Sequence, residues 1–160
     1  MRLSVLERQR RAAFALSVSM AVLGFGCSST PPAANSFTEV YSQIIQPTCS
    51  SDFCHYEGVG IRYGALDMSS QVSAYWSLVD QLCAGAACSG NGNRRVVPGD
   101  PADSIMYLKV SESAPPCGAQ MPADTATLRQ SGSTVFSGTA LTTAQQTLIY
   151  NWIYEGAQDN

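Results

Sequence analysis

Apolar residues recur at helical spacing in the region that follows residue 35. One stripe combines five positions that lie three or four residues apart: Phe37, Val40, Tyr41, Ile44 and Ile45. Ser36 and Glu39 have the spacing of a capping box, in which two side chains satisfy the free N–H groups at a helix start. We therefore expect an amphipathic helix here. Pro47 should end or kink it, which places Cys49 and Cys54 just beyond the helix.

Two shorter helices are predicted in the middle of the chain. The first has Ser69 or Ser70 as its N-cap. The second begins at Asp100, a favourable N-cap, followed by Pro101, which suits the first helical position because it has no N–H to leave unpaired. The apolar positions at helical spacing are Val72, Tyr75, Trp76 and Val79 in the first helix and Ile105, Met106 and Leu108 in the second.

A last helix is predicted near the end of the sequence. Thr143 and Gln146 form a second capping box, and Gly156 closes the helix. Its apolar side consists of Leu148, Ile149, Trp152 and Ile153. The segments 83–95 and 114–138 are rich in small and polar residues and indicate long loops. Because no strand alternation or internal repeat competes with these helices, the predicted fold class is all-α.

The first 26 residues have the pattern of a secretory signal peptide. Four arginines precede an apolar run from Ala12 to Leu23, which is too short to span a bilayer. Gly26 and Cys27 then resemble the cleavage site of a bacterial lipoprotein, where the cysteine is lipidated and becomes the new N-terminus. The leucine expected three residues before that cysteine stands one position too early, and an ordinary cleaved signal is the alternative.

The domain organisation follows from this start. Residues 1–26 are the signal peptide, 27–35 are a flexible tether, and 36–158 are one folded domain. We expect an exported protein of the cell envelope that is anchored to a membrane by its lipid, on the periplasm-facing side or at the outer membrane.

Charge limits the classes of partner. The chain has nine basic and twelve acidic residues, and the first 26 residues hold four of the basic and one of the acidic ones. The remaining five basic and eleven acidic residues give that part a net charge near −6, and its basic residues form no run. We therefore exclude nucleic acid and expect a protein partner with a basic docking face.

Cys49, Cys54 and His55 carry the candidate chemistry. They stand in the run Cys-Ser-Ser-Asp-Phe-Cys-His, and His55 is the single histidine of the chain. A Cys-x-x-Cys-His run attaches c-type haem, because the thiols add to the two vinyl groups while the imidazole ligates the iron. Here four residues separate the thiols instead of two.

A haem iron with one histidine in the chain needs a different second ligand. Methionine thioether is the other common axial partner in electron-carrying cytochromes c. After the signal peptide the chain offers Met68, Met106 and Met121. Met68 stands at a helix entrance and Met106 in a helix, so both are expected to fill the core, whereas Met121 lies in a loop before a proline.

Several separate segments match a known family in the expected order. They are the opening helix with Cys49-x4-Cys54-His55, then 64–70, 97–101 with Ser104, Met121-Pro122 and 149–157. Over residues 37–158 the chain resembles the small extracytoplasmic cytochrome c-like domains related to class I cytochromes c. The resemblance implies a small helical domain whose long loops wrap one covalently attached haem c, with Cys49 and Cys54 as attachment points and His55 and Met121 as iron ligands. It also implies that the first and last helices pack on each other through Val40, Ile44, Trp152 and Ile153.

The resemblance implies a monohaem c-type cytochrome that binds haem and transfers single electrons to a redox partner. With both axial positions filled it would be an electron carrier and not an enzyme, and a peroxidase-like activity would follow only if Met121 does not ligate. The alternative from another class is a haem-free, disulfide-stapled envelope lipoprotein that acts as an interaction module. In that case a Cys49–Cys54 disulfide closes a small loop.

Cys83, Cys88 and Cys117 have no role in this scheme. Beyond Cys27 the chain has five cysteines, so one thiol stays free or pairs between chains whether haem takes two thiols or none. A Cys83–Cys88 disulfide across the 83–95 loop is one candidate pairing. A zinc or copper site that joins these three thiols to His55 has weaker support, because the spacing does not match a Cys-x-x-Cys knuckle. No nucleophile-elbow sequence surrounds a serine, so hydrolysis lacks support.

Overall fold

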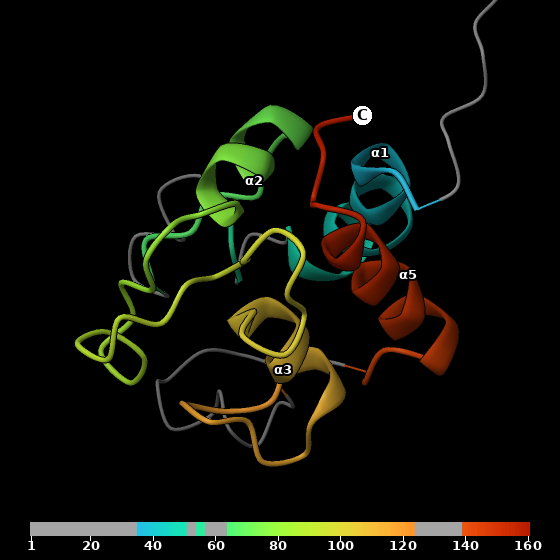
Figure 1. Cartoon of the computed structure of the whole chain (residues 1–160). Helices are drawn as coiled ribbons and strands as arrows, with labels where there is room; N and C mark the ends of the chain where they lie inside the picture. The colour runs from blue at the N-terminus through green and yellow to red at the C-terminus, as the bar shows by residue number, and fades with distance from the viewer. Residues whose placement is uncertain (1–34, 51–53, 57–63, 124–138) are drawn as a thin grey trace, which may run out of the picture. The chain divides into compact units, whose positions relative to one another are not determined.

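A computed structural model describes residues 35–50, 54–56, 64–123 and 139–160, and all structural statements concern these ranges. The helical elements are α1 (Phe37–Val40), the π-helix η2 (Tyr41–Cys49), α2 (Gln71–Leu78), α3 (Ile105–Ser111) and α5 (Thr143–Tyr154) (Figure 1). The described residues form isolated β-bridges but no strand. The predicted all-α class is therefore confirmed for this part of the chain.

The opening helix reaches farther than predicted. Ser36 caps α1 and accepts the N–H of Glu39 at 3.1 Å, while the Glu39 carboxylate accepts the N–H of Asn35 at 3.0 Å. α1 continues directly into η2, and Pro47 lies inside η2. Proline lacks the N–H of a regular helical bond, and the wider π-helical turn accommodates it, so the helix does not end there. Cys49 is consequently the last residue of η2, and the prediction that it follows the helix is wrong.

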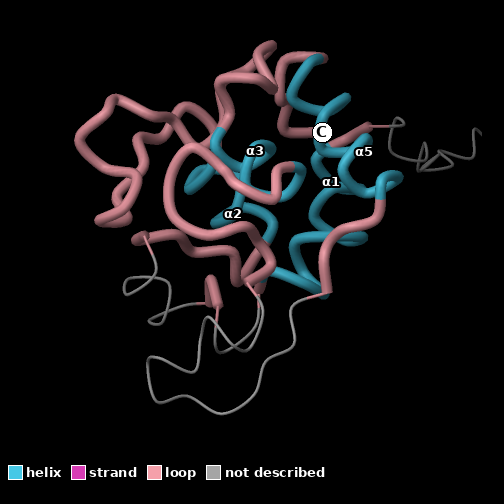
Figure 2. The backbone as a smooth tube through the Cα atoms, turned by 90° about the horizontal axis from the view of Figure 1, so that it is seen from below, coloured by secondary structure: helices cyan, strands magenta, loops and turns pink. Residues whose placement is uncertain are grey.

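The first and last helices form the packed core. α1 and α5 lie side by side in both views (Figures 1 and 2). The rings of Phe37 and Trp152 lie 5.0 Å apart between their centroids. Complete burial of an aliphatic or aromatic side chain of this kind stabilises a fold by roughly 1.5–3 kcal/mol. The predicted packing of the first helix on the last is confirmed for α1 and α5, which are in contact. These side chains belong to one core cluster and are at most 1% exposed: Phe37, Val40, Ile44, Trp152 and Ile153.

α5 begins one residue earlier than predicted, because its N-cap is Thr142 and not Thr143. Thr142 is the N-cap: its hydroxyl accepts the N–H of Gln145 at 3.3 Å, and the Gln145 side chain accepts the N–H of Thr142 at 3.0 Å. The sequence contains two overlapping Thr-x-x-Gln pairs, and the structure uses the first of them. The capping box predicted at Thr143 and Gln146 is therefore wrong by one position, whereas Gly156, with φ of 101°, lies at the helix end as predicted.

α2 packs through a different face from the predicted one. Ala74 and Leu78 are buried, whereas Val72 and Trp76 are each 66% exposed. Apolar residues point in almost every direction around this short helix, so periodicity does not select one face. The small side chain of Ala74 lets the helix approach the core closely, where Tyr75 also packs. The predicted stripe is wrong for Val72 and Trp76.

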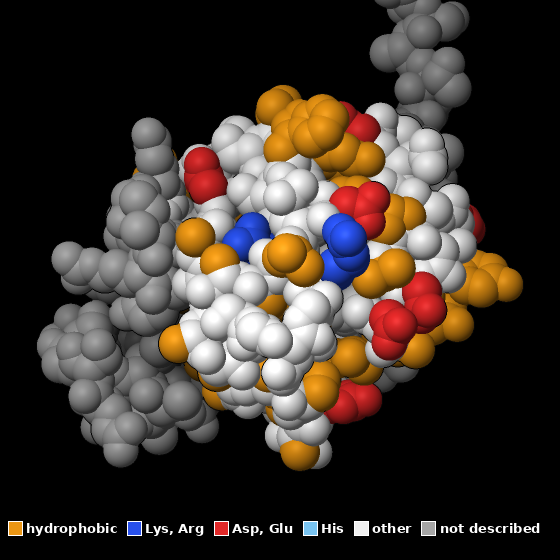
Figure 3. All heavy atoms as spheres, turned by 60° about the vertical axis from the view of Figure 1, so that its left-hand side comes forward, with side chains coloured by type: hydrophobic (Ala, Val, Ile, Leu, Met, Phe, Trp, Pro, Cys, Tyr) orange, Lys and Arg blue, Asp and Glu red, His pale blue; other side chains and the backbone are white. Residues whose placement is uncertain are grey.

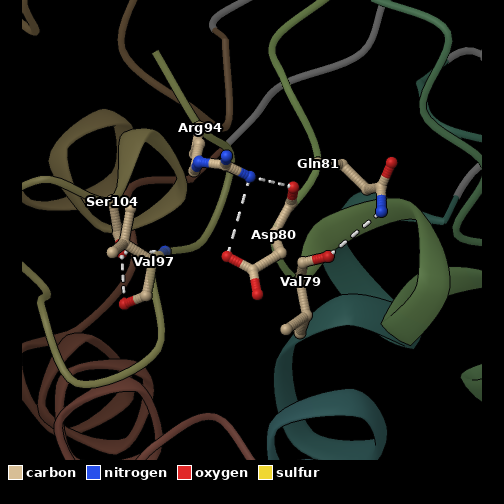
Figure 4. A network of polar contacts seen from close by, with 6 residues as sticks. All are labelled: Val79, Asp80, Gln81, Arg94, Val97 and Ser104. Atoms are coloured by element: carbon tan, nitrogen blue, oxygen red, sulfur yellow. Dashed lines mark hydrogen bonds and ion pairs between the residues drawn. The ribbon is translucent and has the colours of Figure 1, made fainter. Parts of the chain in front are cut away.

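α3 begins later than predicted. The sequence pattern placed the helix start at Asp100, but the residues from Asp100 form a tight turn that precedes the helix. Ser104 is the N-cap, and its hydroxyl donates to the carbonyl of Asp100 at 2.7 Å and accepts the N–H of Val97 at 2.8 Å. Figure 4 shows Ser104 and Val97 facing each other across this turn. The Asp100 carboxylate accepts the N–H of Asp103 at 3.1 Å. The helix start predicted at Asp100 is wrong, because these bonds fold the segment into a turn before α3.

The loop between α2 and α3 folds back on itself. Leu82 and Arg94 form an antiparallel bridge. The Arg94 guanidinium lies 3.7 Å from the Asp80 carboxylate and also donates to the Asp80 carbonyl (Figure 4). These contacts close the base of the loop.

One disulfide ties this loop to the segment after α3. Cys88 and Cys117 are joined with an S–S distance of 2.05 Å, and Cys83 is a free thiol. The N–H of Cys83 donates to the carbonyl of Asn93 at 2.9 Å, so Cys83 is held at the base of the loop. The suggested Cys83–Cys88 pairing is therefore wrong.

Several predictions fall outside the described residues. The signal peptide over 1–26, the lipidation site Cys27 and the tether up to residue 34 all do, and so does 124–138 of the long loop. Residues 114–123 form turns and bends without a helix, as predicted. Of the helices described, none is long and apolar enough to cross a membrane.

Candidate functional site

A cavity of about 370 Å³ opens among η2, α3 and the loops that connect them. Its volume falls in the range of small-molecule sites, roughly 300–1,000 Å³. Much of its wall is aliphatic, and residues from distant parts of the chain supply it: Ile44, Leu66, Leu78, Ile105, Val110, Leu141 and Ile149. The wall can therefore hold an apolar ligand and keep water away from it.

All four residues predicted to hold haem line this cavity: Cys49, Cys54, His55 and Met121. η2 ends at Cys49, and the N–H of His55 donates back to the Cys49 carbonyl at 3.1 Å. The His55 carbonyl accepts the N–H of Met68 at 2.7 Å. Met121 arrives from the loop after α3, where its N–H donates to the carbonyl of Lys109 at 2.7 Å. The fold thus brings the whole predicted set to one place.

The His55 imidazole has an unsatisfied nitrogen. Its Nδ1 is buried and has no hydrogen-bond partner. Nearly all buried polar atoms in proteins are paired, so this nitrogen is exceptional, and it belongs to one of the residues that line the cavity. Burial, together with the positive charges of Arg95 and Lys109, lowers the pKa of His55 to about 4. The imidazole is therefore neutral at pH 7, which is the form that ligates metals.

Cys49 and Cys54 carry free thiols in this structure. Burial raises the pKa of Cys49 to about 12, with a contribution from the neighbouring Cys54. Cys49 is therefore a protonated thiol at neutral pH. The disulfide between these two cysteines that the haem-free alternative requires is not formed in the structure.

Three methionines line the cavity, where the sequence pattern pointed to one. Met68 is 4% exposed and belongs to the core, and Met106 packs against that core, so the core role predicted for both is confirmed. Both also face the cavity beside Met121. The assignment of Met121 among the three thioethers stays a prediction. A sequence pattern could not place Met68 here, because the bond from its N–H to His55 is a tertiary contact.

Arg95, Lys109 and Cys83 also line the cavity. The sequence pattern predicted neither of the two cations, and it suggested Cys83 only as a ligand of a zinc or copper site. One signal was available for Lys109. It is the lone charged residue of α3, a helix that is otherwise rich in apolar residues. A charge in such a context is either carried to the surface by its long side chain or held at a site.

The suggested zinc or copper site is wrong. Cys88 and Cys117 are joined in a disulfide, so their sulfurs cannot serve as thiolate ligands beside Cys83 and His55. Within the described ranges no group of three His, Cys, Asp or Glu side chains could hold a metal ion. A metal held in this cavity by the described residues alone would therefore need further ligands of its own.

Iron porphyrin meets that condition, because the macrocycle supplies four of the ligands and leaves two axial positions. The neutral His55 and a methionine thioether are suitable axial ligands, the two thiols are suitable attachment points, and the aliphatic wall suits the ring. Comparison of the chain with family models, with curated proteins and with solved structures found no match. The functional argument therefore depends on the chemistry of this cavity.

Proposed function

We propose that the chain is a monohaem c-type cytochrome, which binds one haem c in the cavity and transfers single electrons in the cell envelope. The observation that carries this proposal is the convergence of Cys49, Cys54, His55 and Met121 on one apolar cavity. A haem held by two axial protein ligands supplies one-electron chemistry, because its iron cycles between two oxidation states.

The environment of each residue supports its role in the proposal. Cys49 and Cys54 would attach the haem, each adding its S–H across one vinyl group so that a thioether forms. His55 is one axial ligand, and its neutral imidazole offers a lone pair. Met121 is the other, on the loop that α3 positions through the Lys109 carbonyl.

The backbone around the imidazole favours an electron carrier. His55 is held on both sides of its peptide unit, by its N–H bond to the Cys49 carbonyl and by the bond of its carbonyl to the Met68 N–H. A ligand fixed in this way moves little when the charge of a site changes, and the aliphatic wall limits water entry. Both favour fast transfer of single electrons.

We infer a carrier and not an enzyme, because His55 and Met121 would both ligate the iron of a bound haem and would leave no position for a substrate. A peroxidase-like activity requires an open position. Rapid binding of carbon monoxide by the loaded protein would reveal such a position and would contradict this part of the proposal.

A redox protein with a basic docking face is the partner that the surface favours. Among the basic residues that the structure describes, Arg94 pairs with Asp80, and Arg95 and Lys109 are bonded to backbone carbonyls. Acidic side chains are spread over one face in Figure 3, while basic ones are confined to its middle. The exposed carboxylates are those of Asp80, Asp100, Asp103, Glu112, Glu155 and Asp159. Such a surface steers a positively charged partner toward it.

Lipidation at Cys27 completes the proposal, with the folded domain held on the periplasm-facing side or at the outer membrane. The residues that support it are the signal-like start and the Gly-Cys pair. Cys27→Ser should move the protein from the membrane fraction to the soluble fraction, and unchanged fractionation would rule lipidation out.

A series of cysteine variants tests the attachment. Cys49→Ser and Cys54→Ser should each remove one thioether bond, and the double variant should carry no covalent haem after expression with a cytochrome maturation system. Cys83→Ser is the matched control, because Cys83 is another free thiol in the same cavity wall. Mass spectrometry of the denatured proteins gives the readout. Covalent haem that survives in the double variant would refute the proposed attachment.

A further inference from the structure

Two cations in the cavity wall have no counter-charge among the residues that the structure describes. Arg95 and Lys109 both line the cavity. The one salt bridge among the described residues joins Arg94 to Asp80, so neither cation has a carboxylate partner there. Burial lowers the pKa of both side chains, which reflects the lost hydration of their charges. Charged groups that are partly buried normally have a partner, so this pair needs an explanation.

The Lys109 ammonium is held at the cavity by the loop after α3. Its Nζ donates to the carbonyls of Cys117 at 2.8 Å and Ala119 at 3.0 Å. Between them Gly118 has φ of +64°, and a Cβ on it would lie 2.9 Å from Nζ. The loop therefore curls tightly around the ammonium. An ammonium has three N–H groups, so one remains for a ligand.

Arg95 is held by backbone carbonyls from segments that precede it in the chain. Its guanidinium donates to the carbonyls of Gly64 at 2.8 Å and Ala65 at 3.2 Å, and to the carbonyl of Ser77. Since a guanidinium carries five N–H groups, part of its donor capacity is left over. Carbonyl dipoles orient the cation but do not neutralise it.

The two cations act on the same part of the cavity. Both line it together with Cys83, and both oppose the rise that burial causes in the pKa of Cys83. Their charges therefore reach the same side chain. The remainder of the wall is largely aliphatic, so the cavity combines an apolar body with a positive region.

We propose that Arg95 and Lys109 bind the carboxylates of the cavity's ligand, whose apolar body fills the rest of the space. A charge-assisted hydrogen bond from each cation to a carboxylate oxygen supplies the missing counter-charge. For the identity of that body the inference rests on the proposed function, and it assigns the propionate groups of the porphyrin to this pair.

The competing explanation is structural: the two side chains clamp loops through carbonyls and need no ligand. Changing the charge of the ligand separates the two explanations without altering the protein. Metal-free protoporphyrin carries two carboxylates, and its dimethyl ester has the same ring without them. Neither contains iron, so ligation by His55 and Met121 does not contribute to the comparison.

The experiment titrates the full haem-free wild-type chain with each porphyrin and follows porphyrin fluorescence anisotropy. We expect protoporphyrin to bind at least about tenfold more tightly than its dimethyl ester, which corresponds to about 1.4 kcal/mol. Equal affinities, or no binding of either porphyrin, would overturn the proposal.

Variants then test which side chains cause the preference for protoporphyrin over its dimethyl ester. Lys109→Met and Arg95→Met should each bring the affinity ratio toward one, while the adjacent Arg94→Met, whose ion pair with Asp80 lies in the loop, should leave it unchanged. If Arg95→Met does not fold, the wild-type comparison and Lys109→Met still decide. If the chain binds protoporphyrin selectively but never acquires covalent haem, the proposed function is wrong and the role of Arg95 and Lys109 in carboxylate binding stands. If the chain attaches haem but binds both porphyrins equally, the proposed function stands and this inference is wrong.

Discussion

The helical run from α1 through η2 borders two regions of different character. Toward α5, Phe37 and Val40 belong to the same core cluster as Trp152 and Ile153, and all four side chains are at most 1% exposed. Toward α3 it borders a cavity lined by His55, whose imidazole has a buried nitrogen without a hydrogen-bond partner. The first region is complete as a folded core. The second contains groups whose burial has no compensation inside the described chain.

This difference marks the cavity as the candidate binding site. Buried polar atoms without partners destabilise a fold, and chains that keep them usually do so at a binding site. Here His55, which has the unpaired nitrogen, lines the same cavity as the free thiols. So do Arg95 and Lys109, which have no carboxylate partner among the described residues. The packed pair α1 and α5 stabilises the fold, and the unpaired buried groups at the cavity lower that stability.

The largest expected effect is the loss of an aromatic side chain from the packed region. Trp152→Ala should lower the free energy of unfolding by about 3–5 kcal/mol, because the cavity it leaves cannot be refilled. Trp76→Ala is the matched control, since Trp76 is 66% exposed, and it should change stability by less than about 0.5 kcal/mol. Urea unfolding of the haem-free chain measures both. Similar losses in the two variants would show that the packed core is misidentified.

The cavity side should respond to pH. His55 has a pKa of about 4 in the fold against 6.5 in an unfolded chain. The unfolded state therefore takes up the proton first, and the stabilisation present above pH 6.5 is lost as pH falls toward 4. Each unit of the shift corresponds to about 1.4 kcal/mol. Unfolding of the haem-free protein between pH 6.5 and 5 should show this slope, and His55→Gln, which removes the single histidine, should abolish it. An unchanged slope in the variant would contradict the buried neutral imidazole.

The smallest expected effect tests the entry to the packed region. Thr142→Ala removes the N-cap of α5 and should cost about 1 kcal/mol, whereas Thr143→Ala lies inside the first turn and should change little. Thermal unfolding followed by circular dichroism compares them. A larger loss from Thr143→Ala would restore the capping box that the sequence suggested first.

The sequence predicted the packed region better than the cavity, and the reason is physical. Local signals such as the stripe at Phe37 and Val40, and the family resemblance at Ile149 to Ala157, are read from neighbouring residues. The start of α3 at Ser104 depends on hydrogen bonds that compete with a plausible cap at Asp100. Propensity cannot rank two such candidates.

Within the site, residue type predicted Cys49, Cys54 and His55, because their chemistry is rare and they are close in sequence. Arg95 and Lys109 were not predicted, since a basic residue is usually solvated and only the fold turns these two toward the cavity. The Cys88–Cys117 disulfide likewise depends on a loop that doubles back, which cysteine spacing alone cannot reveal.

The pyridine haemochrome spectrum of the wild-type chain, expressed with a cytochrome maturation system, tests the central claim most directly. The account predicts a red protein with the spectrum of covalently attached haem c, one haem per chain, and no disulfide between Cys49 and Cys54. A colourless protein in which peptide mapping finds Cys49 and Cys54 joined in a disulfide would contradict the account and support the haem-free lipoprotein.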